Sequence, residues 1–213
     1  MTFASLLSIC ATEPVISAGL LLAGKIDKHD VHRQLVRWCK TGKLIQLRRG
    51  LYVLATPFQK TAPHPFVIAN ALQMGSYVSC QSALAFYDLI PEHVPAITSV
   101  SPGRPSVWST PFGQFSTRHI HPRLAYGYSS IEIAAGQRAF IATPAKAILD
   151  LVHLEPRADD PGFLGELRFQ NLNQLDVGEL LALARQSNSP KLERAARHVS
   201  LLARQETEEY QSL

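Results

Sequence analysis

The chain has 213 residues, of which 46% are hydrophobic and 18% are charged, with a net charge of +4. This composition excludes wholesale disorder, and the length suits a module of about 60 residues joined to a second domain of about 140. Three widely spaced cysteines, Cys10, Cys39 and Cys80, argue against a disulfide framework or a zinc site. No apolar run approaches the roughly 18 residues of a membrane span, so we expect a cytoplasmic protein without a membrane partner.

The basic residues are concentrated in one part of the chain. Residues 25–60 hold nine basic and two acidic side chains, which gives this segment a net charge of +7. The rest of the chain holds 12 basic and 15 acidic side chains, a net charge of −3. Such an asymmetry indicates a surface that binds a polyanion such as nucleic acid.

Three helices are expected at the N-terminus. Two short apolar helices are predicted over Thr2–Cys10 and Val15–Ala23. The third has stronger signals, because Asp27 is a good N-cap and Asp30 adds a negative charge to the positive first turn. We expect this helix to run from Lys28 to about Thr41, where the glycine that follows is a C-terminal stop signal.

The third helix has an apolar face and a basic face when its residues are placed at about 100° per residue. Val31, Leu35 and Trp38 fall within a narrow arc and are expected to pack against a core. The residues of the opposite arc are His29, Arg33, Val36, Arg37 and Lys40. A solvated charged face is the ordinary explanation of such an arc, but the segment that follows the helix favours a nucleic-acid surface.

A basic hairpin is expected directly after this helix. Leu44–Leu47 and Leu51–Leu54 are β-prone runs, and Arg48-Arg49-Gly50 stands between them. Gly50 can supply the positive φ that a tight turn needs. Three helices and a basic hairpin predict a winged helix-turn-helix over residues 1–56, with the third helix in the major groove of DNA and the hairpin on the flanking backbone.

The predicted DNA-binding residues differ in what they can contact. Arg33 and Arg37 have the donor geometry to read base edges, and Gln34 is a weaker candidate because it lies nearer the packing arc. The hairpin arginines would hold phosphate or enter the minor groove, and Lys43 continues the basic surface from the helix to the hairpin. The complete set is Lys28, His29, Arg33, Gln34, Arg37, Lys40, Lys43, Arg48 and Arg49.

The predicted fold class is α+β, with a larger mixed α/β domain after the winged helix and helices at its end. Prolines mark residues 57–65 as a linker, the second domain covers residues 66–204, and residues 205–213 form a polar tail. The helices expected in the second domain are Phe66–Gln73, Ser79–Leu89, Ala145–Leu154, Gly162–Asn171, Val177–Gln186 and Pro190–Arg204. The expected strands are Ala96–Val100, Phe115–Ile120, Ser130–Ala134 and Ala139–Ala142.

The sequence carries no catalytic signature, so we expect no enzymatic activity, no cofactor and no metal. Gly19 and Gly24-Lys25 have the spacing of a phosphate-binding loop, but Ile26 stands where that loop needs a hydroxyl. His119 and His121 could share one face of a strand, but no Cys, Asp or Glu close in sequence completes a metal site.

Three segments in order carry a resemblance to a known family. The first, Leu35–Tyr52, is similar to the pattern L-x-R-L-x-x-x-G-x-L-x-x-L-x-R-G-x-Y, with Trp38 in place of a leucine. The second is Ile68–Pro91 and the third is Ala142–Leu151. These segments resemble the AbiEi-type antitoxins of bacterial type IV toxin–antitoxin systems, and three segments in the right order are more specific than the R-R-G-x-Y element alone.

The resemblance implies a two-part protein. Its winged helix would bind and repress the operon's own promoter, through the palindromic or repeated half-sites that helix-turn-helix dimers often use. Its second domain would counter a toxin similar to nucleotidyltransferases, without necessarily forming a complex with it. The recurring positions of the second domain, for which a role in holding the fold is equally compatible, are Tyr77, Ser79, Thr143, Lys146 and Asp150.

We therefore predict a sequence-specific DNA-binding autorepressor that acts as an antitoxin. The alternative is a winged-helix transcription factor whose C-terminal domain senses a small ligand. A nuclease targeted by the winged helix is a third class, but the chain lacks the P-D…E-x-K pattern that would support it. A protein–protein adaptor without DNA binding is disfavoured by the basic segment.

Overall fold

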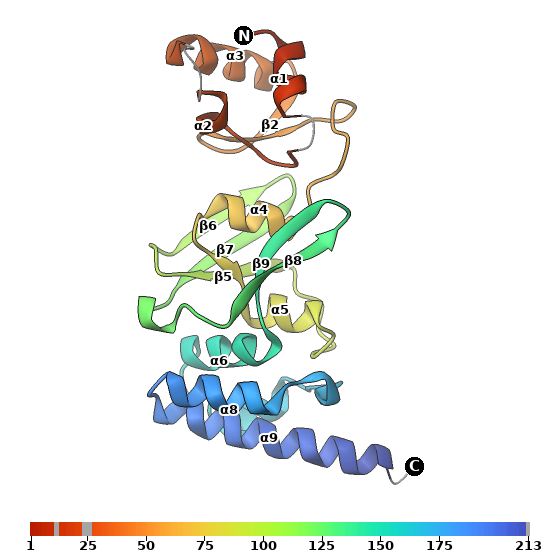
Figure 1. Ribbon diagram of the computed structural model, residues 1–213, viewed down its shortest axis with the longest axis vertical. Helices are drawn as coiled ribbons and strands as arrows, with labels where there is room; N and C mark the ends of the chain where they lie inside the picture. The colour runs from red at the N-terminus through yellow and green to blue at the C-terminus, as the bar shows by residue number, and fades with distance from the viewer. Residues whose placement is uncertain (11–12, 23–26, 212–213) are drawn as a thin grey trace.

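The computed structural model describes residues 1–10, 13–22 and 27–211 of the chain. Figure 1 shows its parts stacked along one axis, with a small helical unit at one end, a larger sheet in the middle and the last helices at the other end. The mixture of helices and strands confirms the predicted α+β class. Residues 23–26, which hold the predicted end of the second helix and the Gly24-Lys25-Ile26 part of the candidate phosphate-binding loop, lie outside the described residues.

The described part of residues 1–54 forms three helices and an antiparallel sheet of strand order β1-β3-β2. In chain order its elements are α1 (Phe3–Ile9), β1 (Ile16–Ser17), α2 (Ala18–Leu21), α3 (Lys28–Lys40), β2 (Leu44–Arg48) and β3 (Leu51–Leu54). We call this part the N-terminal unit. Its core includes the buried side chains of Leu6, Ile16, Leu35 and Trp38, so that each helix and strand is anchored from one side.

The second predicted helix begins later than expected. Ile16 and Ser17 form β1 instead, and they pair with Tyr52 and Leu51 of β3. The Ser17 hydroxyl accepts a hydrogen bond from the Gly19 backbone N–H at 3.2 Å, which caps α2 and fixes its start. Ile16 is β-branched and fully buried, so it gains packing from the strand conformation.

α3 has the boundaries that its capping residues predict. The Asp27 carboxylate accepts a hydrogen bond from the His29 backbone N–H at 2.9 Å, and Gly42 follows the helix with a φ of +68°. The first feature gives an acceptor to a backbone N–H that the helix start leaves unpaired, and the second turns the chain away from the helix at its C-terminal end. β2 and β3 follow as the sequence predicts, and Gly50 in the turn between them has a φ of +79°.

The larger domain is built on a mixed sheet of strand order β6-β7-β5-β4-β9-β8. Its strands are β4 (Tyr77–Val78), β5 (Ala96–Ser101), β6 (Ser106–Thr110), β7 (Gly113–His119), β8 (Tyr128–Ala134) and β9 (Gln137–Ala142). β4 pairs in parallel with β9, and β5 with β7, while the other neighbours are antiparallel. The sequence does not predict β4 and β6, because β4 has two residues and β6 follows a proline-broken stretch.

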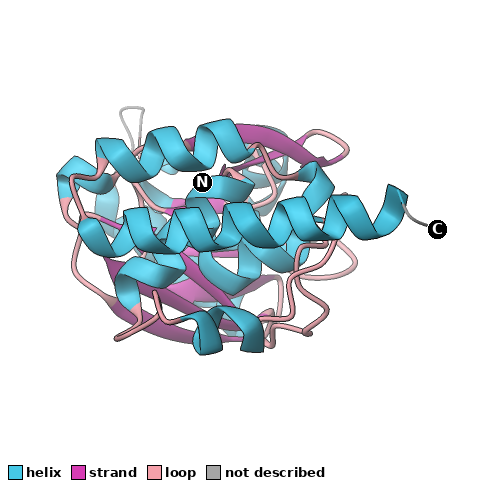
Figure 2. Cartoon of the chain, turned by 90° about the horizontal axis from the view of Figure 1, so that it is seen from below, coloured by secondary structure: helices cyan, strands magenta, loops and turns pink. Residues whose placement is uncertain are grey.

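Helices lie on both sides of this sheet. They are α4 (Pro65–Leu72), α5 (Cys80–Phe86), α6 (Pro144–Leu154), α7 (Pro161–Glu166), α8 (Val177–Gln186) and α9 (Pro190–Gln211), with 3-10 turns η1 (Pro122–Leu124) and η2 (Leu172–Gln174). α4 lies between the N-terminal unit and the larger sheet, and α6, α8 and α9 stack at the opposite end (Figure 1). Seen from that end, α9 crosses the molecule and carries the C-terminus beyond it (Figure 2).

Three helices of the larger domain differ in length from their predictions. α5 is shorter than the predicted Ser79–Leu89, because Asp88 adopts a positive φ of 54° that ends the helical path. α7 is shorter, because Arg168 and Asn171 adopt positive φ values of 46° and 54° that end the helical path. α9 is longer and continues through residues 205–211, which the sequence predicts as a tail. The Glu206 carboxylate accepts a hydrogen bond from the Leu172 backbone N–H at 2.6 Å, which ties this part of α9 to η2.

A buried polar cluster joins β4 to α6 inside the larger domain. The Asp150 carboxylate accepts hydrogen bonds from the Tyr77 hydroxyl at 3.0 Å and the Ser79 hydroxyl at 2.8 Å. The Lys146 ammonium lies 2.5 Å from the same carboxylate and donates to the Leu124 carbonyl at 2.7 Å. Burial raises the pKa of Asp150, and the Lys146 ammonium and the two hydroxyls oppose that rise. Burial and the nearby carboxylate also raise the pKa of Tyr77, which keeps its phenol protonated as a donor.

Four of the five recurring positions of the second domain therefore meet in one cluster. Tyr77, Ser79, Lys146 and Asp150 are all buried, so their side chains face one another rather than solvent. The fifth, Thr143, accepts a hydrogen bond from the Lys146 backbone N–H and caps α6. These contacts give each of the five residues a role in holding the fold.

Replacing Asp150 with alanine should lower the free energy of unfolding by about 3–5 kcal/mol, because the buried Lys146 ammonium loses its carboxylate partner. The double variant Lys146→Met/Asp150→Leu should recover most of that loss, since it removes both charges. Urea unfolding followed by circular dichroism measures both values. A loss below about 1 kcal/mol for Asp150→Ala would contradict a structural role for the cluster.

Candidate nucleic-acid interface

The exposed side of α3 forms a continuous stripe, and α3 lies at the end of the molecule remote from the larger sheet (Figure 1). Val31, Leu35 and Trp38 on its other side are buried in the N-terminal unit. The exposed residues recur every three or four positions, so they share one side of the helix. These residues, which we call the outer face of α3, are Lys28, His29, His32, Arg33, Val36, Arg37 and Lys40.

The structure places the predicted helix residues of the site at different depths. The lysines, arginines and His29 are exposed, whereas Gln34 is half-buried, in agreement with its position near the packing arc. His32 joins the outer face although the predicted arc omits it. Its spacing from His29 and Val36 is that of a shared helix side, so periodicity alone could have found it.

The cations of the outer face are free or weakly held. Arg33 forms an ion pair with Asp30, and both side chains are at least half exposed. Exposed pairs of this kind contribute about 0.2–1 kcal/mol, so Arg33 can exchange Asp30 for another anion at small cost. Within the described residues, Lys28, Arg37 and Lys40 form no ion pair.

Lys43 is held beside the start of α1. Its Nζ atom lies 4.7 Å from the centroid of the Phe3 ring, a cation–π contact. Phe3 also packs edge-on against Trp38, at 5.4 Å, and Phe58, at 5.0 Å. This aromatic group positions the Lys43 ammonium at the C-terminal end of α3, between the helix and the hairpin.

Arg48 has a role that the sequence does not predict. Its Nε donates to the Leu72 carbonyl at 3.0 Å, and its Nη2 lies 3.5 Å from the Ala71 carbonyl. These carbonyls belong to the last turn of α4, where a helix leaves acceptors unpaired and a cation is favoured. The guanidinium predicted to hold phosphate is thus bound to the larger domain, and Arg49 is the exposed cation of the hairpin turn.

The hairpin also packs against the larger domain through apolar side chains. Leu47, Leu51 and Val53 belong to the same buried core as Phe66 and Leu72 of α4. The sheet of the N-terminal unit is therefore covered on this side. α3 lies on the other side of that sheet, so the outer face points away from the contact with the larger domain (Figure 1).

The two histidines considered for metal binding serve local contacts. His119 Nδ1 lies 3.0 Å from the Gly103 carbonyl, and His121 Nδ1 accepts a hydrogen bond from the Arg123 backbone N–H. In the part of the chain that the structure describes, no three His, Cys, Asp or Glu side chains are grouped as metal ligands. Among the same residues, no helix has the length and apolar character needed to cross a membrane.

Comparison with known proteins shows a similarity of fold. No protein-family model matches the chain, and no curated protein matches it. The crystal structure of the Rv2827c protein from Mycobacterium tuberculosis is similar, with a TM-score of 0.52 and 16% sequence identity. The likeness covers 92% of this chain and 75% of that one, so it extends over both the N-terminal unit and the larger domain.

The two hairpin arginines should differ in their effect on stability. Arg48→Ala should lower the free energy of unfolding by about 1–2 kcal/mol, because it removes charge-assisted hydrogen bonds from a half-buried group. Arg49→Ala, which changes the same charge at an exposed position, should stay within about 0.5 kcal/mol of the parent. Urea unfolding compares them, and equal losses would contradict the assignment of Arg48 to α4.

Proposed function

We propose that this chain is a sequence-specific DNA-binding protein and that residues 1–56 form a winged helix-turn-helix. The chain order α1, β1, α2, α3, β2, β3 and the strand order β1-β3-β2 support this assignment. In such a module the helix that precedes the hairpin enters the major groove. In this chain that helix is α3.

The observation that carries the proposal is the composition of the outer face of α3. Four of its seven residues are lysine or arginine and two are histidine, and the acidic side chain that borders it, Asp30, is paired with Arg33. All seven are exposed, so none is needed for packing. A solvated helix surface commonly mixes both charges, whereas a face that binds DNA gains affinity by neutralising phosphates and releasing their counterions.

The residues of the outer face suit different parts of a duplex. Arg33 and Arg37 can donate two hydrogen bonds each to a guanine edge, and Lys28 and Lys40 nearer the helix ends can pair with phosphates. Val36 lies among these polar residues with 39% of its surface exposed. We assign it to the methyl group of a thymine, an apolar feature of the major groove.

The hairpin has a smaller share in this proposal than the sequence predicts. With Arg48 held on α4, Arg49 is the hairpin cation available to a phosphate. Lys43 adds a positive charge at the C-terminal end of α3. Affinity would then depend mainly on α3.

The wider role proposed is that of a transcriptional autorepressor and antitoxin, which the three-segment resemblance supports. The DNA partner would be the promoter of its own operon, with palindromic or repeated half-sites, and a nucleotidyltransferase-like toxin would be a functional partner. Because the recurring residues Tyr77, Ser79, Lys146 and Asp150 are buried, any antitoxin contact must use other, exposed side chains of residues 66–204.

The experiment that tests DNA binding compares the parent with Arg33→Ala/Arg37→Ala/Lys40→Ala on the duplex upstream of its own gene, over a range of salt concentrations. We expect the variant to bind at least about 100-fold more weakly. The slope of log K against log salt should fall by about 0.9, since Lys40 is the one of the three assigned to a phosphate and each lost phosphate contact accounts for roughly 0.9. Fluorescence anisotropy measures both quantities.

The matched control is Arg104→Ala/Arg123→Ala/Arg185→Ala, which removes the same charge from exposed positions of the larger domain. Its affinity and slope should stay within about twofold of the parent, because these residues belong to the larger domain and not to the outer face of α3. If both triple variants lose affinity equally, binding follows net charge and the outer face is not the interface.

The Val36 assignment has its own test. Replacing one thymine of the bound duplex with deoxyuridine removes a single methyl group, and at the contacted position this should weaken binding by the parent about three- to tenfold. The Val36→Ala variant should be insensitive to the same replacement. If every thymine replacement affects parent and variant alike, Val36 reads no methyl group.

A further inference from the structure

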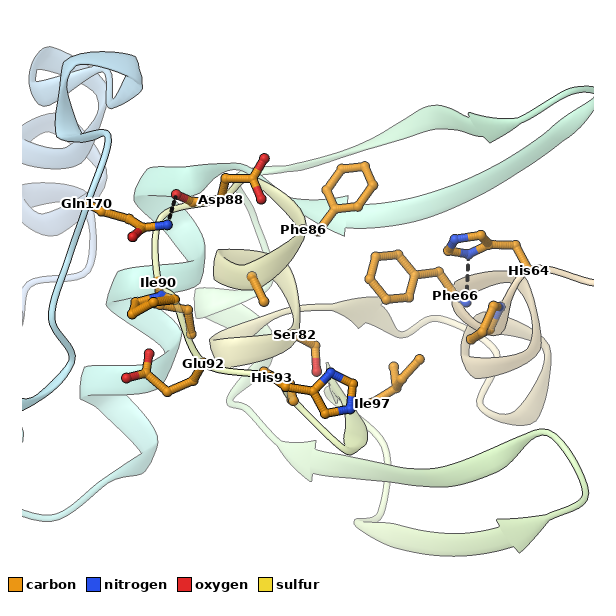
Figure 3. A pocket seen from close by; sticks show the side chains of 14 residues that line it. His64, Phe66, Ser82, Phe86, Asp88, Ile90, Glu92, His93, Ile97 and Gln170 are labelled. Carbon is orange, nitrogen blue, oxygen red and sulfur yellow. Dashed lines mark hydrogen bonds between the residues drawn. The ribbon is translucent and has the colours of Figure 1, made fainter.

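A cleft of about 580 Å³ opens in the larger domain between α4, α5 and the segment that precedes β5. Figure 3 shows the side chains that surround it. Its size lies within the range of about 300–1,000 Å³ that small-molecule sites occupy. Neither the proposed DNA contact nor the buried cluster uses this cleft.

One wall of the cleft is aromatic. The Phe66 and Phe86 rings lie 5.5 Å apart, and the His64 ring packs edge-on against Phe66 at 5.0 Å. Phe86 is 37% exposed. These rings come from the starts and ends of two helices, α4 and α5, that are held in place by the core below them, so the wall is preformed.

The histidine in this wall is a neutral hydrogen-bond donor. Burial lowers the pKa of His64, which favours the uncharged imidazole. Its Nδ1 accepts the Phe66 backbone N–H at 3.1 Å and caps α4. Because Nδ1 acts as the acceptor, the ring proton resides on Nε2. The aromatic wall therefore carries no positive charge.

Two carboxylates also line the cleft. Asp88 is exposed at the cleft, and its backbone is fixed because the Gln170 and Asn171 side chains donate to its carbonyl at 3.2 and 2.8 Å. Among the described residues, no ion pair or hydrogen bond engages the Asp88 carboxylate. It is a free negative charge beside the aromatic wall.

Glu92 is the second carboxylate. Its Oε1 accepts two hydrogen bonds from Arg168, at 2.9 and 2.6 Å, and this pairing lowers the pKa of Glu92. Its Oε2 is buried and, within the described residues, has no hydrogen-bond partner. Glu92 is therefore a carboxylate already paired with Arg168 at the border of the cleft, and Asp88 is the carboxylate open to a ligand.

The charged residues that line the cleft indicate which class of ligand it could bind. Besides the imidazoles of His64 and His93, the ionisable residues lining the cleft are Asp88 and the Arg168-paired Glu92, so an anion would meet the unpaired Asp88 carboxylate and no lysine or arginine of the lining. A metal ion lacks the grouped ligands it would need among the described residues. We propose that this cleft binds a small organic cation whose flat aromatic body lies against Phe66 and Phe86 and whose N–H groups donate to the Asp88 carboxylate.

Three nearly isosteric probes test this site, because benzamidinium, benzamide and benzoate share one ring and differ in charge. Isothermal titration calorimetry should show benzamidinium binding at least tenfold tighter than benzamide, with no heat from benzoate. Backbone amide shifts in a ¹⁵N spectrum should concentrate in residues 64–66 and 86–93. Equal binding of the three probes, shifts elsewhere, or no binding of benzamidinium at 20 mM (roughly the weakest affinity of a fragment site) would overturn the proposal.

Two variants distinguish the contribution of the carboxylates to binding from that of the aromatic wall. Asp88→Asn/Glu92→Gln should bring benzamidinium within about twofold of benzamide, and Phe86→Ala should weaken both probes about tenfold. Glu166→Gln/Glu208→Gln, at two exposed positions outside the cleft, makes a matched charge control and should leave all affinities unchanged. Retention of the full benzamidinium preference in Asp88→Asn/Glu92→Gln would also overturn the proposal. None of these measurements involves DNA, so their result is independent of the proposed repressor function.

Discussion

A carboxylate can stay buried only where donors replace the water that it loses, and Asp150 places this constraint on the larger domain. Two of its donors, Tyr77 and Ser79, come from β4 and the residue after it, and the third, Lys146, also holds the Leu124 carbonyl. The cluster thus fixes a central strand, α6 and the turn after β7 relative to one another. α4 packs on the neighbouring strands β5 and β9, so its position follows from the same join.

The orientation of the N-terminal unit follows from α4 in turn. Arg48 binds the carbonyls at the end of this helix, and Leu47 and Leu51 pack into the core beside it. One side of the small sheet is therefore occupied by the larger domain. α3 lies on the remaining side, and its cations stay exposed because nothing in the described chain is packed over them. In the proposed DNA complex, the larger domain would thus restrict how the unit could approach a duplex.

The sequence alone predicts structural features whose causes lie within a few residues, such as helix caps and the faces of a helix. Asp27 and Thr143 start α3 and α6 where their capping chemistry indicates, and the outer face of α3 follows from helical periodicity, with His32 as the omission. The sequence alone does not predict features that depend on a residue far away in the chain. Ile16 becomes a strand because β3 lies beside it, and Arg48 turns to carbonyls that lie more than twenty residues later in the chain. The cleft is also invisible in the sequence, since its walls come from separate elements without a shared motif.

α4 contacts both the cleft and the hairpin of the N-terminal unit. His64 and Phe66 at its start border the cleft, while Ala71 and Leu72 at its end hold the Arg48 guanidinium. A helix of eight residues is about 12 Å long, and its internal hydrogen bonds make it move as one body. A shift of the aromatic wall is then also a shift of the hairpin anchor. The helix that carries part of the cleft wall therefore also carries the anchor of the N-terminal unit, with no loop between the two.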